Sequence, residues 1–348
     1  MNRVPGPETG RGHRAGGKPR LRLSGLDMLL VAILAAGFGS IVWSVRASGG
    51  PAWEWRVLGQ YIVHGDGRPG LLLQGLFTTI RLTCWSAVIA LAQAMENNLL
   101  RAEHLLHIRC ELADKAVVDM FSSVMDHELL RLVSIMDHTP GQRQWSDLEK
   151  YRSFHADKKW TDEELLAEIE RLRAVQASHA EPNRETILGL CRERGLPLAS
   201  HDDTTVEHVE ETARLGMGIA EFPTTREAAS RARELGLATV LGAPNVVRGA
   251  SHSGNASALD LATDGLVDIL SSDYMPASLL QAPFVMAEKL GLPLHQTLRT
   301  VTANPARALG LSDRGELLPG KRADLLRVRM VDDVPVVVAV WREGRQVM

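Results

Sequence analysis

From Gln93 onward, short apolar runs alternate with amphipathic helical stretches, and this alternation restricts the possible fold more than any other feature. Such a rhythm is typical of repeated βα units on a parallel sheet. Strands are expected at residues 105–110, 130–136, 196–200, 218–222, 238–241 and 267–271. A charged helix with a solvated face is expected at Trp160–Val175. The pattern predicts an α/β fold with a TIM-like (β/α) barrel that is N-terminally incomplete.

The end of the chain departs from this rhythm. Residues 323–328 and 334–340 are apolar enough for two strands, and Asp332 and Asp333 between them favour a turn. We therefore expect a partial barrel over residues 93–312, followed by a C-terminal β segment over residues 313–348.

The first part of the chain has a membrane-like composition. Residues 28–45 carry no charge and could cross a bilayer as a helix, with a signal peptide as the alternative. A second stretch, residues 71–92, is weaker because it contains Gln74 and Arg81. Basic residues before the first stretch favour a cytoplasmic N-terminus. We expect residues 1–92 to be a membrane-type segment that anchors a cytoplasmic catalytic part to the inner membrane.

Bulk properties exclude several classes of function. The net charge of −3 gives no general basic field, so nucleic acid is not expected as a partner. The three cysteines have no CxxC spacing, which argues against a disulfide framework and a thiolate zinc site. Cys110 lies within an expected strand, where a small buried side chain is the ordinary interpretation. No local pattern indicates Ser-His-Asp or Cys-His catalysis.

Metal-capable side chains recur where the expected strands end. These residues are Glu111, Asp137, His138, His201, Asp202, Asp203 and Asp273. The C-terminal ends of barrel strands face one mouth, so distant positions would converge there. Imidazole and carboxylate groups suit a divalent ion such as zinc or manganese, and Asp273 would accept a proton from water. His104 and His107 precede the strand exit, so we expect structural roles for them.

Two stretches are suited to binding anions. Residues 242–255 are rich in Gly, Ser and Asn and include two cationic groups, so we expect a loop that holds phosphate oxygens. The alternative is a simple connecting loop. Residues 138–144 add Gln142 and Arg143 beside His138. The candidate substrate-binding residues are Gln142, Arg143, Asp202, Asn245, Arg248, Ser251, His252, Ser253 and Asn255.

Long phrases of the chain, in order, resemble one known family. They are RAEHLLHIRCE, SIMDHTPGQRQ, LASHDDTT, AEFPTT, GAPNVVRGASHSGN, DILSSDYMPASLL and TANPARALGL with GKRADL. Residues 93–348 resemble the diphosphatases of bacterial phosphonate degradation, which are of amidohydrolase type. The resemblance implies cleavage of α-D-ribose 1-methylphosphonate 5-triphosphate to α-D-ribose 1-methylphosphonate 5-phosphate and diphosphate. The expected substrate is thus a small phosphorylated sugar phosphonate.

The resemblance also implies site residues. Glu111, His138, His201 and Asp273 match the later metal ligands, and Asp273 also matches the catalytic base. Family members begin with half of a small β-sandwich and a first barrel strand that carries an HxD metal motif, whereas the early HxD here, at residues 64–66, lies between the two apolar stretches. We therefore expect a β-sandwich remnant at the C-terminus, binding of a single ion and reduced turnover.

Residues 1–92 resemble a different family from the rest of the chain. The phrase LLLQGLFTTIRLT is similar to the start of the transmembrane domain in permease subunits of polar amino acid ABC transporters. Two alternatives to an active hydrolase follow. The chain could be an inactive fusion product, or a membrane protein associated with transport in which the rest is a passenger.

Overall fold

The computed structural model describes residues 100, 102–158, 160–249 and 255–348, all within the compact unit Ala87–Met348. The predicted membrane stretches 28–45 and 71–92, with the permease-like phrase and the early HxD, lie outside the described residues. Among the helices that are described, none is long and apolar enough to cross a membrane.

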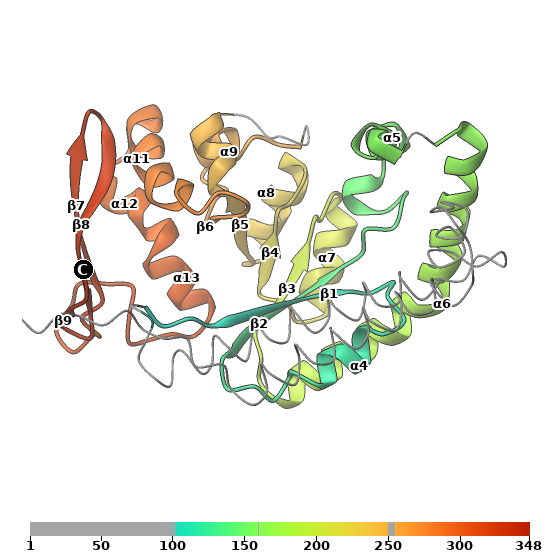
Figure 1. The fold of residues 1–348 in the computed structure, drawn as a ribbon, viewed down its shortest axis with the longest axis horizontal. Coiled ribbons are helices and arrows are strands. Elements are labelled where there is room, and N and C mark those ends of the chain that lie inside the picture. Colours follow the sequence, from blue (N-terminus) through green and yellow to red (C-terminus); the bar gives the residue numbers. More distant parts are fainter. Residues whose placement is uncertain (1–99, 101, 159, 250–254) are drawn as a thin grey trace, which may run out of the picture. The chain divides into compact units, whose positions relative to one another are not determined.

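Six parallel strands form the central sheet, in the order of the sequence (Figure 1). They are β1 (Leu106–Glu111), β2 (Leu130–Met136), β3 (Leu198–His201), β4 (Ile219–Glu221), β5 (Ala238–Gly242) and β6 (Ile269–Ser271). All six were predicted, each to within two residues at either end. In the described part of the chain, β1 and β6 pair with one neighbour each, so the sheet is an open arc. This arrangement confirms a TIM-like partial barrel.

Helices connect the strands. They are α4 (Val117–Ser122), α5 (Leu148–Phe154), α6 (Asp162–Glu193), α7 (Val206–Arg214), α8 (Arg226–Glu234), α9 (Ala243–Arg248), α10 (Ala258–Thr263), α11 (Ser278–Leu290), α12 (Leu294–Leu298) and α13 (Ala303–Ala308), with short 3₁₀ turns at Arg143–Trp145, Ala156–Lys158 and Arg299–Val301. A capping box between Thr161 and Glu164 starts α6. This helix has 32 residues, twice the predicted length, because good helix formers continue past the charged stretch.

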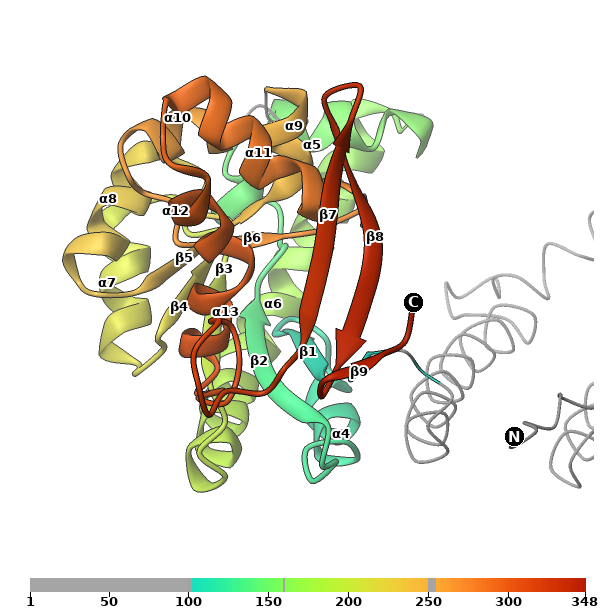
Figure 2. The ribbon, with the colours of Figure 1, turned by 90° about the vertical axis from the view of Figure 1, so that its left-hand side faces the viewer.

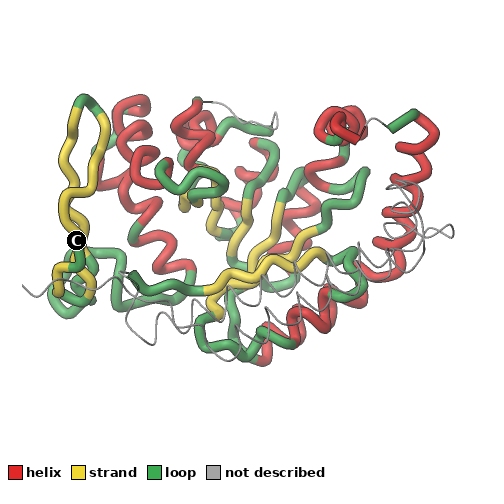
Figure 3. Tube along the Cα trace, viewed as in Figure 1, coloured by secondary structure: helices red, strands yellow, loops and turns green. Residues whose placement is uncertain are grey.

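Figure 3 shows the strands of the sheet and the helices around it. Alternation of side chains along the strands gives the sheet two faces. Outward side chains such as Cys110 and Val133 pack against Phe121 of α4 and Ile187 of α6, and all four are at most 1% exposed. The predicted burial of Cys110 is therefore confirmed. Because side chains alternate with a period of two, the residues between the outward ones face inward. On this inner face, a second cluster contains Ala199, Ile219, Val240 and Ile269.

A separate antiparallel sheet ends the chain (Figure 2). It consists of β7 (Leu325–Val331), β8 (Val334–Arg342) and the short β9 (Arg345–Gln346). The turn between β7 and β8 has positive φ at Asp332 (47°) and Asp333 (60°), as a two-residue hairpin with the twist of its strands requires. The predicted hairpin and its turn are confirmed.

Ion pairs centred on Glu103 connect the residues before β1 to those before β7. The Glu103 carboxylate accepts hydrogen bonds from Arg314 and from Arg322 Nη1, the latter at 2.8 Å. Burial alone would raise the pKa of Glu103, but the two guanidinium groups outweigh burial and lower it. Arg322 also lies 2.9 Å from Asp324 Oδ2, so one network joins the residues before β1 to those before β7.

We expect Glu103→Gln to destabilise the protein by about 1–2 kcal/mol near neutral pH. A lowered carboxyl pKa contributes stability above the unfolded-state pKa, and this stability is lost as the pH falls through the folded-state pKa. The difference between wild type and variant should therefore shrink in acid. Urea unfolding between neutral pH and pH of about 3 measures it. A constant difference across that range would show that the charge of Glu103 contributes nothing.

Candidate metal centre and active site

Four strands send polar side chains to one mouth of the sheet. On β1, the inward positions that alternate with Cys110 are His107, Arg109 and Glu111. The sheet register then places Arg109 beside Ser134, and it pairs His201 with Glu221. Contacts in this site join residues that are 20 to 92 positions apart in sequence.

Three ligand atoms converge at this mouth. Asp202 Oδ2 lies 3.4 Å from His201 Nε2 and 3.6 Å from His138 Nε2. His138, His201 and Asp202 each offer one such atom within 4.8 Å of the others. His201 and Asp202 are 5% exposed, and Asp202 Oδ2 is buried without a hydrogen-bond partner. A buried carboxylate oxygen that makes no hydrogen bond is costly, so this atom is suited to a cation.

The backbone at the strand exits adopts an uncommon conformation. Asp202, Phe222 and Asp273 have φ of 55°, 53° and 47°, in the left-handed region. Non-glycine residues enter this region rarely, and functional sites are where such residues cluster. The turn after β3 directs Asp202 toward the two histidines, and the Phe222 ring packs edge-on against His201, with centroids 5.4 Å apart.

Glu111 orients His138. Its Oε2 lies 2.6 Å from His138 Nδ1, and its Oε1 accepts from the backbone N–H of the same residue at 3.0 Å. Both oxygens of Glu111 thus contact His138, and Glu111 is not among the converging ligand atoms, although the sequence predicted a direct ligand. Burial opposes a charge on His138, but Asp202 and Glu111 outweigh burial and raise its pKa to about 9. A metal ion would have to displace this proton.

His201 is held from both sides of its ring. Arg109 Nη2 lies 2.7 Å from Nε2, and Glu221 Oε2 lies 3.4 Å from Nδ1. Glu221 also accepts a hydrogen bond from Ser134 Oγ at 2.7 Å. Burial alone would raise the pKa of Glu221, but its contacts with His201, His107 and Ser134 outweigh burial and lower it. Glu221 is therefore an anion at neutral pH.

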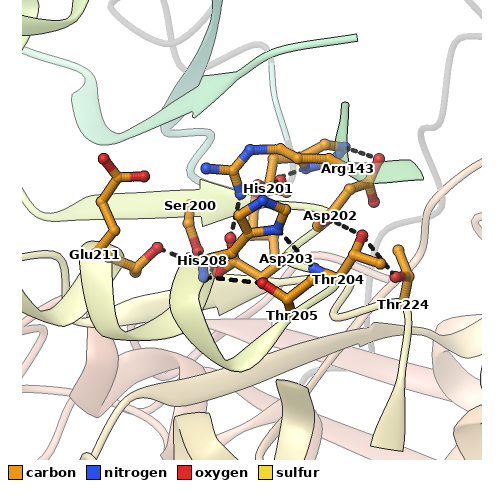
Figure 4. Close-up of polar contacts among 12 residues, drawn as sticks. Arg143, Ser200, His201, Asp202, Asp203, Thr204, Thr205, His208, Glu211 and Thr224 are labelled. Carbon is orange, nitrogen blue, oxygen red and sulfur yellow. Dashed lines mark hydrogen bonds and ion pairs between the residues drawn. The ribbon is translucent and has the colours of Figure 1, made fainter. Parts of the chain in front are cut away.

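The side chains of Asp202 and Asp203 point in different directions from the backbone (Figure 4). Asp203 bonds to Arg143 and accepts from Ser200 Oγ at 2.5 Å. Arg143 also donates to the carbonyl oxygen of His201 at 3.2 Å. Arg143 and Gln142 line a smaller cavity of about 190 Å³ beside α6 and α7, away from the converging ligand atoms. These two predicted anion-binding residues therefore do not line the pocket that His138, His201 and Asp202 share.

A cavity of about 470 Å³ opens over the converging ligand atoms. Asp273 and Asn245 line it, so the structure places the predicted base in the same pocket as the histidines. Asn245 Oδ1 is buried without a hydrogen-bond partner. A Cβ on Gly242 would lie 3.3 Å from Asp273 Oδ2 and 3.5 Å from Asn245 Nδ2, so glycine leaves room for both side chains. The outer wall is aromatic and contains Trp145, Tyr151, Phe154 and His155.

The prediction of a loop at residues 242–255 was wrong in its first half, which is helical. Residues Ala243–Arg248 form α9, because Pro244 at the start favours a helix and Gly249 (φ 82°) ends it. Arg248 is exposed at the end of this helix and does not line the pocket, whereas Asn255 does. Ser251, His252 and Ser253 lie outside the described residues.

Sequence reasoning missed two polar residues of the site, Arg109 and Glu221. Arg109 is next to Cys110, whose expected burial against helices already implied that Arg109 faces inward. Glu221 ends a strand that was predicted correctly, so its position at the exit was visible as well. Their partners depend on strand register, which the sequence alone did not provide.

Comparison with solved structures finds proteins of low sequence identity to this chain. One is N-acetylglucosamine-6-phosphate deacetylase from Pasteurella multocida, at 12% identity and TM-score 0.44, covering 71% of this chain and 68% of that one. Another is a D-hydantoinase from Thermus sp., at 10% identity and TM-score 0.35, covering 69% and 63%.

Two family profiles match parts of the chain. The amidohydrolase family matches residues 179–348, and a family described as HNH/ENDO VII superfamily nuclease with conserved GHE residues matches residues 130–185. The nuclease match covers parts of the sheet and of α6, and its segment contains no consecutive Gly-His-Glu.

Curated relatives give a stronger result. Imidazolonepropionase of Ruegeria sp. (strain TM1040) is 25% identical over 181 residues, 44% of each chain. The α-D-ribose 1-methylphosphonate 5-triphosphate diphosphatase of Escherichia coli (strain K12) is 48% identical over 261 residues, which cover 74% of this chain and 69% of the relative. At this identity over more than two thirds of both proteins, the chain belongs to the α-D-ribose 1-methylphosphonate 5-triphosphate diphosphatase family of amidohydrolases.

Proposed function

We propose that this chain is a metal-dependent diphosphatase of phosphonate catabolism. Its substrate would be α-D-ribose 1-methylphosphonate 5-triphosphate, cleaved to α-D-ribose 1-methylphosphonate 5-phosphate and diphosphate. The observation that carries the proposal is the buried Asp202 Oδ2, which faces two histidine nitrogens and makes no hydrogen bond, in a chain 48% identical to a diphosphatase. A pocket of about 470 Å³ is within the usual size range of small-molecule sites.

The donor set fits one divalent ion. His138 and His201 each present Nε2 toward Asp202, and mixed imidazole and carboxylate donors suit zinc or manganese. When bound, the ion supplies Lewis acidity to the phosphoryl oxygens. Glu111 keeps the ring of His138 turned toward the site through its two contacts. Arg109 donates a hydrogen bond to the lone pair of His201 Nε2 in this structure, so its guanidinium must turn away when an ion binds.

Other residues would bind the substrate and move the proton. Arg109 places a permanent positive charge at the pocket, and a guanidinium suits phosphate oxygens. The unpaired amide oxygen of Asn245 can accept from a ribose hydroxyl, and Asn255 adds a second amide. A water oxygen would bond to phosphorus as the bond to the diphosphate oxygen breaks. Asp273 would accept the proton of that water as general base.

The metal site can be tested by replacing Asp202. Asp202→Asn should lower zinc affinity by about 10-fold or more, because the charged ligand is lost while asparagine tolerates the left-handed backbone. Asp137→Asn is the matched control, since its carboxylate binds Thr139 N–H and Gln176 instead. Zinc titration against a fluorescent chelator measures both. Equal affinities for wild type and Asp202→Asn would exclude the proposed centre.

The reaction can be tested by diphosphate release from the ribosyl triphosphate, with and without added zinc or manganese. Asp273→Asn should lower kcat by about 10²–10⁴-fold, as expected for a lost general base. Asp332→Asn is the control, because Asp332 has the same φ of 47° but lies in the β7–β8 turn. Metal-independent release, or no release by wild type together with a metal content near zero, would contradict the proposed function.

A further inference from the structure

Glu221 is a buried carboxylate for which the proposed reaction has no use. It is 6% exposed, lies at the end of β4, and faces the inner side of the sheet. The desolvation of a charged group is costly and is retained only where contacts compensate it. The contacts of Glu221 therefore indicate its role.

The hydrogen bonds of His201 define which ring nitrogen carries its proton. A guanidinium can only donate, so Arg109 Nη2, at 2.7 Å, requires an accepting lone pair on His201 Nε2. In the neutral ring, the proton is then on Nδ1, which faces Glu221 Oε2 at 3.4 Å. Sheet register pairs His201 with Glu221, so the two side chains leave neighbouring strands on the same face.

Glu221 is itself held in place from β2 and β1. Ser134 Oγ donates to Glu221 Oε2 at 2.7 Å, and Ser134 is fully buried. His107 Nε2 bonds to Ser134 Oγ and lies 3.6 Å from Glu221 Oε1. A chain of polar contacts therefore runs from β1 through β2 and β4 to the histidine on β3.

From these contacts we infer that Glu221 is a positioning residue for His201. It keeps the His201 proton on Nδ1, so the Nε2 lone pair points toward Asp202 and the metal site. Ser134 and His107 fix the Glu221 carboxylate for this role. Carboxylates that bind the second nitrogen of a ligand histidine set its tautomer and ring orientation. The inference rests on the proposed metal site, but its first consequence can be observed without metal.

The first experiment determines the tautomer of His201 in the metal-free, full-length protein by heteronuclear NMR of the ring nitrogens, assigned with His201→Gln. Wild type should show the Nδ1-protonated form. Because Arg109 also requires the lone pair on Nε2, the variants are compared in the Arg109→Leu background. There, Glu221→Leu removes the acceptor at similar volume and should give a mixture of tautomers. Glu221→Gln keeps an acceptor oxygen and should restore the wild-type form. An unchanged tautomer in Glu221→Leu would overturn the inference, since a merely structural role predicts that outcome.

The second experiment measures zinc affinity of the same variants. Glu221→Leu should weaken binding by about 10–100-fold, with a smaller loss in Glu221→Gln. Ser134→Ala should also weaken binding, because it frees the carboxylate without removing it. Thr239→Val is its control, since Thr239 is a buried hydroxyl of the same sheet that bonds to Leu266 O and Asp268. Affinities within about threefold of wild type in Glu221→Leu would overturn the inference.

The two proposals fail in different ways. If wild type and His201→Gln bind zinc equally, the proposed metal site is wrong, while the tautomer of His201 still tests the role of Glu221. If Glu221→Leu does not fold, Ser134→Ala tests the role of Glu221 instead, because this variant deletes one hydroxyl and keeps the charge of Glu221. Zinc binding by Ser134→Ala equal to that of Thr239→Val would then overturn the inference.

Discussion

The structure depends on the alternation of side chains along parallel strands that all have helices on one side. The outward residues, such as Cys110 and Val133, pack into a closed apolar layer with α4 and α6. This packing leaves the inward positions for polar side chains. A one-residue slip of any strand would exchange the two sets and place charged groups against the helices, at a cost of several kcal/mol for each buried charge. Register is therefore strongly fixed, and the site with it.

Polar residues on the inner face form a connected system and not a set of independent ligands. Glu111 contacts Nδ1 of His138, and Glu221 faces Nδ1 of His201. In each histidine, a carboxylate thus lies beside the ring nitrogen that points away from Asp202. The arrangement is similar on the two sides of Asp202, whose Oδ2 has no hydrogen-bond partner. Imidazole rings that are oriented in advance need less reorganisation when an ion binds.

Much of the fold could be predicted because its determinants are local. Apolar runs between helical stretches located the six strands of the sheet, and two consecutive aspartates located the β7–β8 turn. The helix at Ala243–Arg248 was missed, because glycines suggested a loop although Pro244 is favourable in a first helical turn. The true length of α6 was missed because the charged pattern ends before the helix does.

For the site, the sequence by itself determined which metal-capable residues stand at strand ends, since chain direction and strand position are local properties. Only the tertiary structure decided which of them converge. It placed Asp202 between His138 and His201, turned both oxygens of Glu111 onto His138, and directed Arg143 toward Asp203. These outcomes depend on strand register and on left-handed backbone turns at the strand exits. Both arise from packing between segments far apart in the chain, for which no single stretch of sequence carries the information.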